Sequence, residues 1–356
     1  MIEITEQLAA QHPNRKNVYV FTLKNDAGTE VRVTNYGAII MSIKIRKSDG
    51  SFNDVVLGFD EPQQYWSDAY LKKYPYYGAA IGRYANRIKG SAITIEGKEY
   101  ALQGAGSGCQ LHGGVEGFDK KVWDKIAAGD GQVVLQYVSP DGEEGFPGNL
   151  TVQVIFSLNE ANEFSYEYKA TTDAPTAVNL THHGYFNLNN GKGRIDNHHL
   201  RVHASHYLEQ DENYCTTGTI LPVKGTRNDF SAYQETGNIE HPEKGIDISF
   251  PLDQQGIDRV AAEAWCDEED VKLEVYTTEP VVHLYNSYGS PDITGKNGQP
   301  YTAFSAFCFE TQVHPNAITI PSFPNTVLKP GEEYYTKTIY KFVNQSGFRN
   351  LTDLYG

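Results

Sequence analysis

The stretch Ala92-Ile93-Thr94-Ile95-Glu96-Gly97-Lys98-Glu99-Tyr100-Ala101-Leu102 alternates apolar and polar residues on both sides of Glu96-Gly97. A period of two puts the apolar side chains of an extended chain on one face. A two-residue turn ending in glycine suits the backbone angles of a tight hairpin. The stretch therefore predicts two antiparallel strands.

Segments rich in β-branched and aromatic residues recur along the chain with turn residues between them, which predicts an all-β, antiparallel fold. The expected strands are residues 17–23, 31–36, 39–45, 133–138, 150–158, 164–170, 271–277 and 337–343. Only residues 61–73 resemble a helix of any length. Strand-helix-strand alternation and a glycine-rich phosphate turn are both missing from the sequence, which argues against a dinucleotide-binding fold.

The chain has 356 residues, enough for a substantial core. No repeat, low-complexity tract or Pro/Ser-rich linker divides it, so we expect one β domain over residues 1–356. The acidic run at residues 267–270 is expected to be a solvated loop tip.

The formal charge of −15 argues against nucleic acid and anionic membranes as partners, because both are bound chiefly through Lys and Arg. A small neutral or cationic ligand is favoured instead. The acidic N-terminus resembles no secretory signal and no apolar run could span a bilayer, so we expect a cytoplasmic protein. Its four cysteines form no C-x-x-C pair, and we expect them to be reduced.

Four segments concentrate polar and ionisable residues beyond what strands and turns require. They are GRYANRI at 82–88, LHGG at 111–114, THHGYFNL at 181–188 and FETQ at 309–312. Adjacent residues of a strand point to opposite faces, so only one of His182 and His183 can easily face a given pocket. The histidine spacings match neither H-E-x-x-H nor a zinc finger, and we expect no catalytic metal.

Each of the other candidates also has a plain structural interpretation. Glu310 follows an apolar run and could be a desolvated general base, or it could lie on the solvent face of a strand. His112 precedes two glycines, a pattern that fits close ligand approach or an ordinary turn. Arg83 and Arg87 could donate to hydroxyls or tie loops to carbonyl groups. No G-x-S-x-G elbow occurs, so acid–base chemistry remains.

Together, and in this order, these segments resemble the aldose 1-epimerase (galactose mutarotase) family. The resemblance extends to GFDK at 117–120 and to further segments, and covers residues 18–342. The further segments are DVVLGF at 54–59, SPDGEEG at 139–145, YTTEP at 276–280 and LKPGE at 328–332. It implies a single large antiparallel β-sandwich.

The resemblance also implies an isomerase that interconverts the α and β anomers of free aldoses such as galactose or glucose, without a cofactor. It makes His183 the general acid and Glu310 the general base, and it leaves Arg83 structural. The residues that it implies for sugar binding are Asn86, Arg87, His112, Tyr185, Asp247 and His283. The expected partner is a small aldose, and the expected assembly a monomer or dimer.

The sequence departs from the family's usual pattern at His182, Gly184, His283 and Ile248. His283 stands where a sugar-contacting glutamine is usual, which puts the sugar preference in question. Two alternatives stay open: a glycoside hydrolase that uses Glu310 and Asp247, and a non-catalytic carbohydrate-binding β-sandwich. A hydrolase has less need of three pocket histidines, and a binding module needs no matched acid and base.

Overall fold

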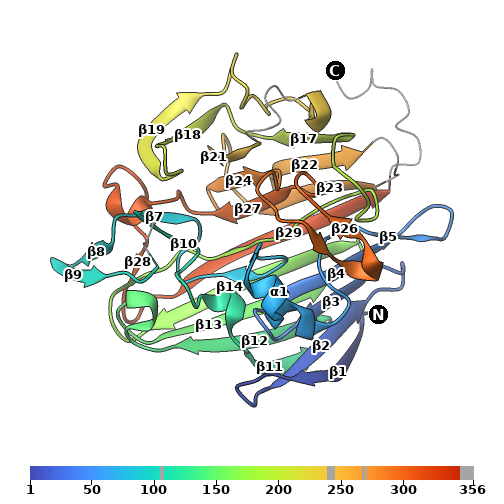
Figure 1. Cartoon of the computed structure of the whole chain (residues 1–356), viewed down its shortest axis with the longest axis horizontal. Helices are drawn as coiled ribbons and strands as arrows, with labels where there is room; N and C mark the ends of the chain where they lie inside the picture. The colour runs from blue at the N-terminus through green and yellow to red at the C-terminus, as the bar shows by residue number, and fades with distance from the viewer. Residues whose placement is uncertain (105–107, 239–244, 267–268, 270, 345–356) are drawn as a thin grey trace.

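The computed structural model describes residues 1–104, 108–238, 245–266, 269 and 271–344. A nine-stranded antiparallel sheet forms one layer of the protein (Figure 1). In spatial order its strands are β11 (Asp124–Gly129), β12 (Gln132–Ser139), β13 (Leu150–Leu158), β14 (Glu163–Thr172), β29 (Tyr334–Asn344), β23 (Val271–Thr277), β22 (Val260–Cys266), β17 (His198–Val202) and β20 (Gln234–Glu235). Strands from both halves of the chain thus lie side by side in one sheet.

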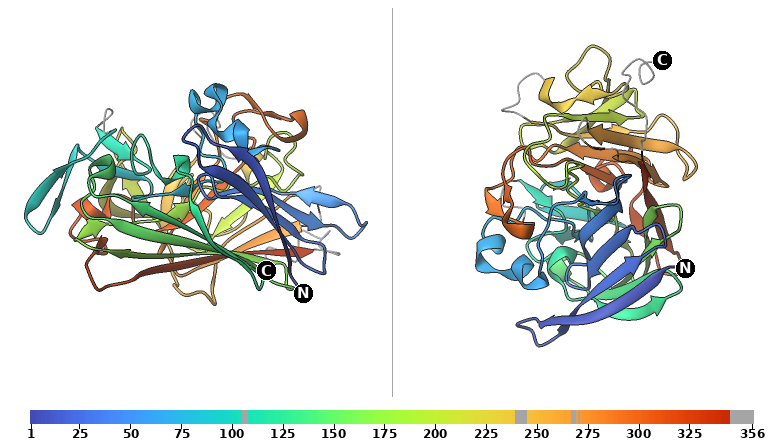
Figure 2. Two further views of the ribbon diagram at one scale, coloured as in Figure 1. Left: turned by 90° about the horizontal axis from the view of Figure 1, so that it is seen from below. Right: turned by 90° about the vertical axis from the view of Figure 1, so that its right-hand side faces the viewer.

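The second layer holds a five-stranded and a three-stranded sheet, which pack over the large sheet (Figure 2). The five-stranded sheet contains β1 (Glu3–Gln11), β2 (Asn17–Lys24), β3 (Glu30–Thr34), β4 (Ile39–Arg46) and β5 (Phe52–Asp54). The three-stranded sheet has the order β21 (Asp247–Pro251), β24 (Val281–Tyr285) and β27 (Cys308–Gln312). The layers form the expected β-sandwich.

The main core lies between these layers, because each central strand buries every second side chain. In β13, buried and half-buried residues alternate along the whole strand. The core joins Phe21 of β2 and Phe156 of β13 to Phe309 of β27 and Phe342 of β29. Apolar burial of this kind is the main driving force for folding.

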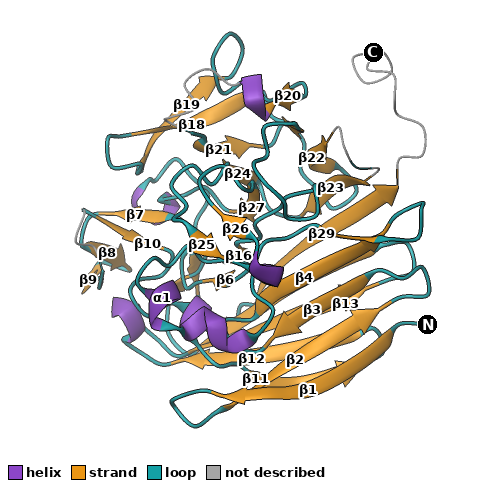
Figure 3. Ribbon diagram, turned by 45° about the vertical axis from the view of Figure 1, so that its right-hand side comes forward, coloured by secondary structure: helices purple, strands orange, loops and turns teal. Residues whose placement is uncertain are grey.

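Pairs of short strands and a few helical turns complete the fold (Figure 3). The paired strands are β6 (Ala80–Ile81) with β16 (Thr181–His182), β7 (Arg87–Lys89) with β10 (Cys109–Leu111), β8 (Ala92–Ile95) with β9 (Lys98–Ala101), β15 (Thr176–Ala177) with β28 (Val327–Leu328), β18 (His206–Gln210) with β19 (Thr216–Pro222), and β25 (Ile293–Thr294) with β26 (Pro300–Tyr301). The β8–β9 pair is the hairpin predicted around Glu96-Gly97, and both turn residues have positive φ angles.

The helix expected at residues 61–73 is broken into two short pieces. A 3-10 helix, η1 (Pro62–Trp66), is followed by the single-turn α1 (Asp68–Leu71). Ser67 between them is extended, with φ −69° and ψ 147°, and its hydroxyl accepts a hydrogen bond from the backbone N–H of Tyr70. Ser67 thus ends one piece and caps the next, so a continuous helix does not form. Other 3-10 turns are η2 (Phe118–Lys120), η3 (Glu143–Gly145), η4 (Thr236–Asn238), η6 (Lys296–Gly298) and η7 (Ala317–Thr319).

The cysteines correct a second expectation. Cys109 of β10 forms a disulfide with Cys215, which precedes β19, so not all four thiols are reduced. The two are 106 residues apart in sequence, and only the fold brings them together. Cys266 and Cys308 are buried. Residues 267, 268 and 270 of the expected acidic loop tip lie outside the described residues.

Among the described helices, none is both long and apolar enough to cross a lipid bilayer.

Candidate functional site

One face of the three-stranded sheet carries the polar side chains of the candidate site. The register places Ser249 of β21 opposite His283 of β24, and His283 opposite Glu310 of β27. Asp247 precedes Ser249 by two residues and therefore points to the same face. The sheet thus aligns two carboxylates and an imidazole across three strands.

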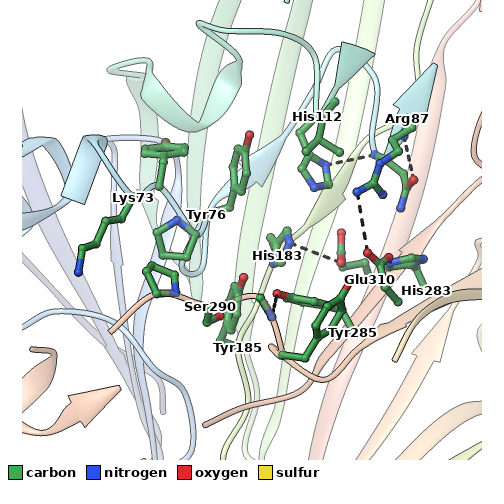
Figure 4. Close-up of a pocket in the computed structure, with 18 residues that line it drawn as sticks. Lys73, Tyr76, Arg87, His112, His183, Tyr185, His283, Tyr285, Ser290 and Glu310 are labelled. Carbon is green, nitrogen blue, oxygen red and sulfur yellow. Dashed lines mark hydrogen bonds and ion pairs between the residues drawn. The ribbon is translucent and has the colours of Figure 1, made fainter. Parts of the chain in front are cut away.

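The adjacent histidines point in opposite directions, as the strand geometry predicts. His183 faces the pocket, where its Nε2 lies 3.5 Å from Oε1 of Glu310 (Figure 4). His182 points into the core, where its Nδ1 lies 3.0 Å from the hydroxyl of Tyr168. Both imidazoles are buried, but only His183 has a carboxylate opposite it.

Glu310 is 1% exposed, so it does not lie on a solvent face. Its Oε1 faces His183, and its Oε2 has no hydrogen-bond partner among the described residues. An unpaired carboxylate oxygen inside a protein is costly unless a ligand satisfies it. Glu310 is therefore placed to accept a proton from a bound molecule.

Two tyrosine rings stack with the His183 imidazole. The ring of Tyr185 lies 4.9 Å from it at an interplanar angle of 13°, and that of Tyr76 lies 5.9 Å from it at 16°. Burial lowers the pKa of His183 below its ordinary value, and the charge of Glu310 partly offsets this effect. The carboxylate and the π faces both favour the protonated form of His183.

His112 is locked in place by the turn that follows β10. The backbone N–H of Asn86 donates to Nδ1 of His112 at 3.2 Å, and the N–H of His112 donates to the carbonyl of Asn86 at 2.9 Å. Burial and the neighbouring cations hold the pKa of His112 well below its ordinary value, so the ring is neutral. Because Nδ1 accepts a hydrogen bond, the ring proton lies on Nε2, which can donate it to a ligand.

The carboxylate of Asp247 contacts two side chains that carry N–H donors. His283 Nε2 lies 2.9 Å from its Oδ1, and a guanidinium nitrogen of Arg87 lies 3.8 Å from its Oδ2. Burial raises the pKa of Asp247, but the hydrogen bond and charge of His283 and the charge of Arg87 outweigh burial and lower it. Asp247 is therefore a carboxylate that can only accept hydrogen bonds.

These side chains line one cavity of 240 Å³. That is smaller than the roughly 300–1,000 Å³ typical of sites for drug-sized ligands, and it suits a single sugar ring. Asn86, Arg87, His112, His183, Tyr185, Asp247, His283 and Glu310 all line it. The structure thus brings together every residue that the sequence assigned to catalysis or sugar binding.

Part of the wall of this cavity was not predicted from the sequence. The residues without a prediction are Lys73, Tyr74, Pro75, Tyr76, Tyr285, Tyr288, Gly289, Ser290 and Pro291. Proline and three tyrosines at residues 74–77 form an aromatic turn, and this cluster was the available signal. Tyr76 has a positive φ of 62°, which is uncommon for an aromatic residue.

Arg83, Ile248 and Gly184, which the sequence analysis also named, lie outside the cavity wall and contribute to packing or to hydrogen bonds within the fold. Arg83 lies outside the cavity, and its buried guanidinium donates five hydrogen bonds. The acceptors are the hydroxyls of Ser139 and Thr176 and the backbone carbonyls of Ser139, Pro140 and Pro147. Ile248 belongs to the main core, on the face of β21 opposite to that of Asp247. A Cβ at Gly184 would lie 3.1 Å from the ring of Phe186, a tight contact that favours glycine there.

Among the described residues, His112, His183 and Glu310 could each offer one ligand atom to a metal, and these atoms lie within 4.8 Å of one another. The same three groups also form a compact set of proton donors and acceptors. Acid–base chemistry requires proton donors and acceptors close together, and it requires no metal ligand.

The chain is similar over almost its whole length to known proteins of one family. The profile of the Aldose 1-epimerase family matches residues 19–341. The chain is 39% identical to a galactose mutarotase of Bos taurus and 35% identical to an aldose 1-epimerase of Escherichia coli, with 96% of this chain and 99% of each relative aligned. The crystal structure of a galactose 1-epimerase from Lactobacillus acidophilus superposes with a TM-score of 0.82 at 25% identity, covering 97% of this chain and 99% of that one.

Proposed function

Because the chain belongs to the aldose 1-epimerase family, we propose that His183 and Glu310 are the acid and base with which it interconverts sugar anomers. Family membership makes the protein an isomerase, an aldose 1-epimerase. The expected substrates are free aldoses such as galactose or glucose. The observation that carries this assignment is the 3.5 Å approach of the His183 Nε2 to the Glu310 carboxylate inside a buried cavity.

Ring opening needs one proton removed and one proton supplied. Glu310 accepts the proton of the anomeric hydroxyl while His183 donates its proton to the ring oxygen. The bond between the anomeric carbon and the ring oxygen breaks, and an open-chain aldehyde forms. The two oxygens sit on one carbon, so an acid and a base only a few ångströms apart can reach both.

Reclosure reverses the proton transfers. After rotation about the first carbon–carbon bond, the ring hydroxyl attacks the other face of the aldehyde. His183 then takes back the hydroxyl proton, and Glu310 returns its proton to the carbonyl oxygen. Both groups regain their starting states, so the cycle consumes nothing.

The remaining wall of the cavity is suited to an uncharged ring. Asp247 accepts from sugar hydroxyls, while Asn86, Arg87 and His112 donate to sugar oxygens. The rings of Tyr185 and Tyr76 can shield the apolar side of the sugar. Arg87 is already paired with Asp247, and Lys73 donates to the carbonyl of Asp292. The carboxylates of Asp247 and Glu310 line the same cavity and repel a phosphate, which favours free over phosphorylated sugars.

The whole chain is proposed to form one domain, because a single core draws on residues from Phe21 to Phe342. Both alternatives fit less well. A non-catalytic binding module has no need of the buried acid–base pair, and the curated relatives are named as mutarotases and epimerases.

Polarimetry on freshly dissolved α-galactose, α-glucose and α-glucose 6-phosphate tests this proposal. We expect the rotation of the free sugars to relax much faster than in buffer, with little acceleration for the phosphate. Relaxation at the buffer rate for every sugar would refute the proposed function.

A further inference from the structure

Asp247 is the only carboxylate besides Glu310 that lines the cavity among the described residues. Its two oxygens face different groups, with His283 at Oδ1 and Arg87 at Oδ2. His283 is 2% exposed, and behind its imidazole lies the fully buried Ser249. The distance from Ser249 Oγ to His283 Nδ1 is 2.8 Å.

We propose that Ser249 and His283 are positioning residues that fix the direction of the Asp247 carboxylate. This inference rests on the proposed function, since it concerns how the same site holds its sugar. Ser249, His283 and Asp247 form a chain of hydrogen bonds across two neighbouring strands. The sugar contact is made by Asp247 at the end of this chain.

The protonation pattern follows from what each group can donate. Ionised Asp247 is an acceptor only, so the hydrogen between it and His283 belongs to Nε2 of the imidazole. When the ring is neutral, Nδ1 is the acceptor and the hydroxyl of Ser249 donates to it; when the ring is protonated, Nδ1–H donates to the Ser249 oxygen instead. In both cases Ser249 holds the imidazole with its Nε2–H directed at Asp247.

The strand register makes the arrangement rigid. Ser249 and His283 are directly opposed across β21 and β24, and Asp247 lies two residues before Ser249 on the same face. Directly opposed side chains of an antiparallel pair are close enough to interact without rearrangement. Arg87 approaches the carboxylate from β7, a different element, so the carboxylate is held from two sides.

The consequence for specificity is that Asp247 presents a fixed acceptor to the sugar. A hydroxyl that donates along this direction is favoured, and an analogue that lacks it leaves a buried carboxylate oxygen unpaired. Loss of the fixed direction weakens discrimination at that one hydroxyl. If His283 contacted the sugar directly, its replacement would instead weaken discrimination at a different hydroxyl.

Kinetics with a panel of 2-, 3-, 4- and 6-deoxygalactose separate these cases. Asp247→Asn identifies the hydroxyl that binds Asp247. In this variant, the loss of kcat/KM that removal of that hydroxyl causes in the wild type disappears. His283→Ala is expected to raise KM for galactose about 10-fold, the lower end of the range for a hydrogen bond to a charged group, and to lose sensitivity to the same hydroxyl. His283→Gln is expected to recover part of this loss, since its amide can still donate to Asp247 and accept from Ser249.

The tautomer of His283 can be read without any activity, from histidine 15N–1H correlation spectra of the intact protein. We expect the Nε2–H form in the wild type and a mixture of forms in Ser249→Ala. Absence of mutarotation in the wild type would refute the proposed function and leave this spectral test standing. An Nδ1–H ring in the wild type, loss of sensitivity to a different hydroxyl in His283→Ala, or equal impairment of the Gln and Ala variants would each overturn the inference.

Discussion

The short strand β16 and the residue that follows it place similar buried groups in very different surroundings. The pocket side pairs His183 with Glu310 across a cavity. The interior side holds His182 beside Tyr168, and Glu279 beside Tyr334. Burial lowers the pKa of His182 to about 3 and raises that of Glu279 to about 8, so both interior groups are neutral near pH 7.

Burial alone therefore does not make a catalytic group. On the interior side, burial dominates and no opposite charge compensates it. On the pocket side, Glu310 opposes the effect of burial on the pKa of His183, and His283 and Arg87 keep Asp247 ionised. A reactive site here combines burial with charged partners and a space that a ligand can enter.

The two buried glutamates provide the largest expected difference. Glu310→Gln removes the proposed base but keeps the shape of the side chain, and it should lower kcat by about 10²–10⁴-fold. Glu279→Gln should leave kcat near the wild-type value, because Glu279 hydrogen-bonds to Tyr334 on the interior side. Polarimetry with galactose measures both, and circular dichroism confirms folding. Equal rate losses in two folded variants would remove the distinction between the sides.

The stacked tyrosines should have a smaller effect. Tyr76→Leu removes a π face from His183 and should lower kcat/KM several-fold, since cation–π contacts contribute about 0.5–2 kcal/mol. It should also move the alkaline limb of the pH–rate profile to lower pH. Tyr76→Phe keeps the ring and is the matched control. An unchanged limb in Tyr76→Leu, or the same shift in Tyr76→Phe, would show that the stacking does not stabilise the imidazolium.

The smallest expected effect on the rate is that of Glu279, which acts on stability instead. Glu279 ionises near pH 4.5 in the unfolded chain and near pH 8 in the folded protein. Between these values the folded protein binds the extra proton, so the contribution of Glu279 to the free energy of unfolding falls as the pH rises. The total loss should be on the order of 5 kcal/mol, since the pKa differs by about 3.5 units and one unit corresponds to about 1.4 kcal/mol.

Urea unfolding of wild type and Glu279→Gln between pH 5 and pH 8 isolates this contribution. The difference between their free energies of unfolding should change steadily over this window in favour of the variant. A constant difference would mean that Glu279 is already ionised in the folded protein.

Strand positions were largely predictable because the alternation of apolar residues is the same pattern that burial imposes. Strands β13 and β23 have the predicted bounds, and each buries alternate residues. The break at Ser67 was not predicted, because its extended backbone depends on local caps that residue type alone does not decide. The Cys109–Cys215 disulfide was not predicted, since it depends on the contact of two strand pairs, β7–β10 and β18–β19, that are distant in sequence.

The candidate site divides in the same way. His183 and Glu310 lie in segments whose order resembles a known family, so sequence could assign them. Ser249 gave no such signal, because its relation to His283 depends on the register between β21 and β24. The position of the Tyr76 ring beside His183 depends on the path of a loop that lines the cavity. Contacts fixed by register and loop path become visible only in three dimensions.

The proposed mechanism requires that His183, and not its neighbour His182, transfers the proton. The most direct test compares His183→Ala with His182→Ala in polarimetry on freshly dissolved α-galactose. We expect His183→Ala to lower kcat by about 10²–10⁴-fold, while His182→Ala keeps most of the rate and loses stability to urea. Equal loss of rate in both folded variants, or a larger loss in His182→Ala, would contradict the account.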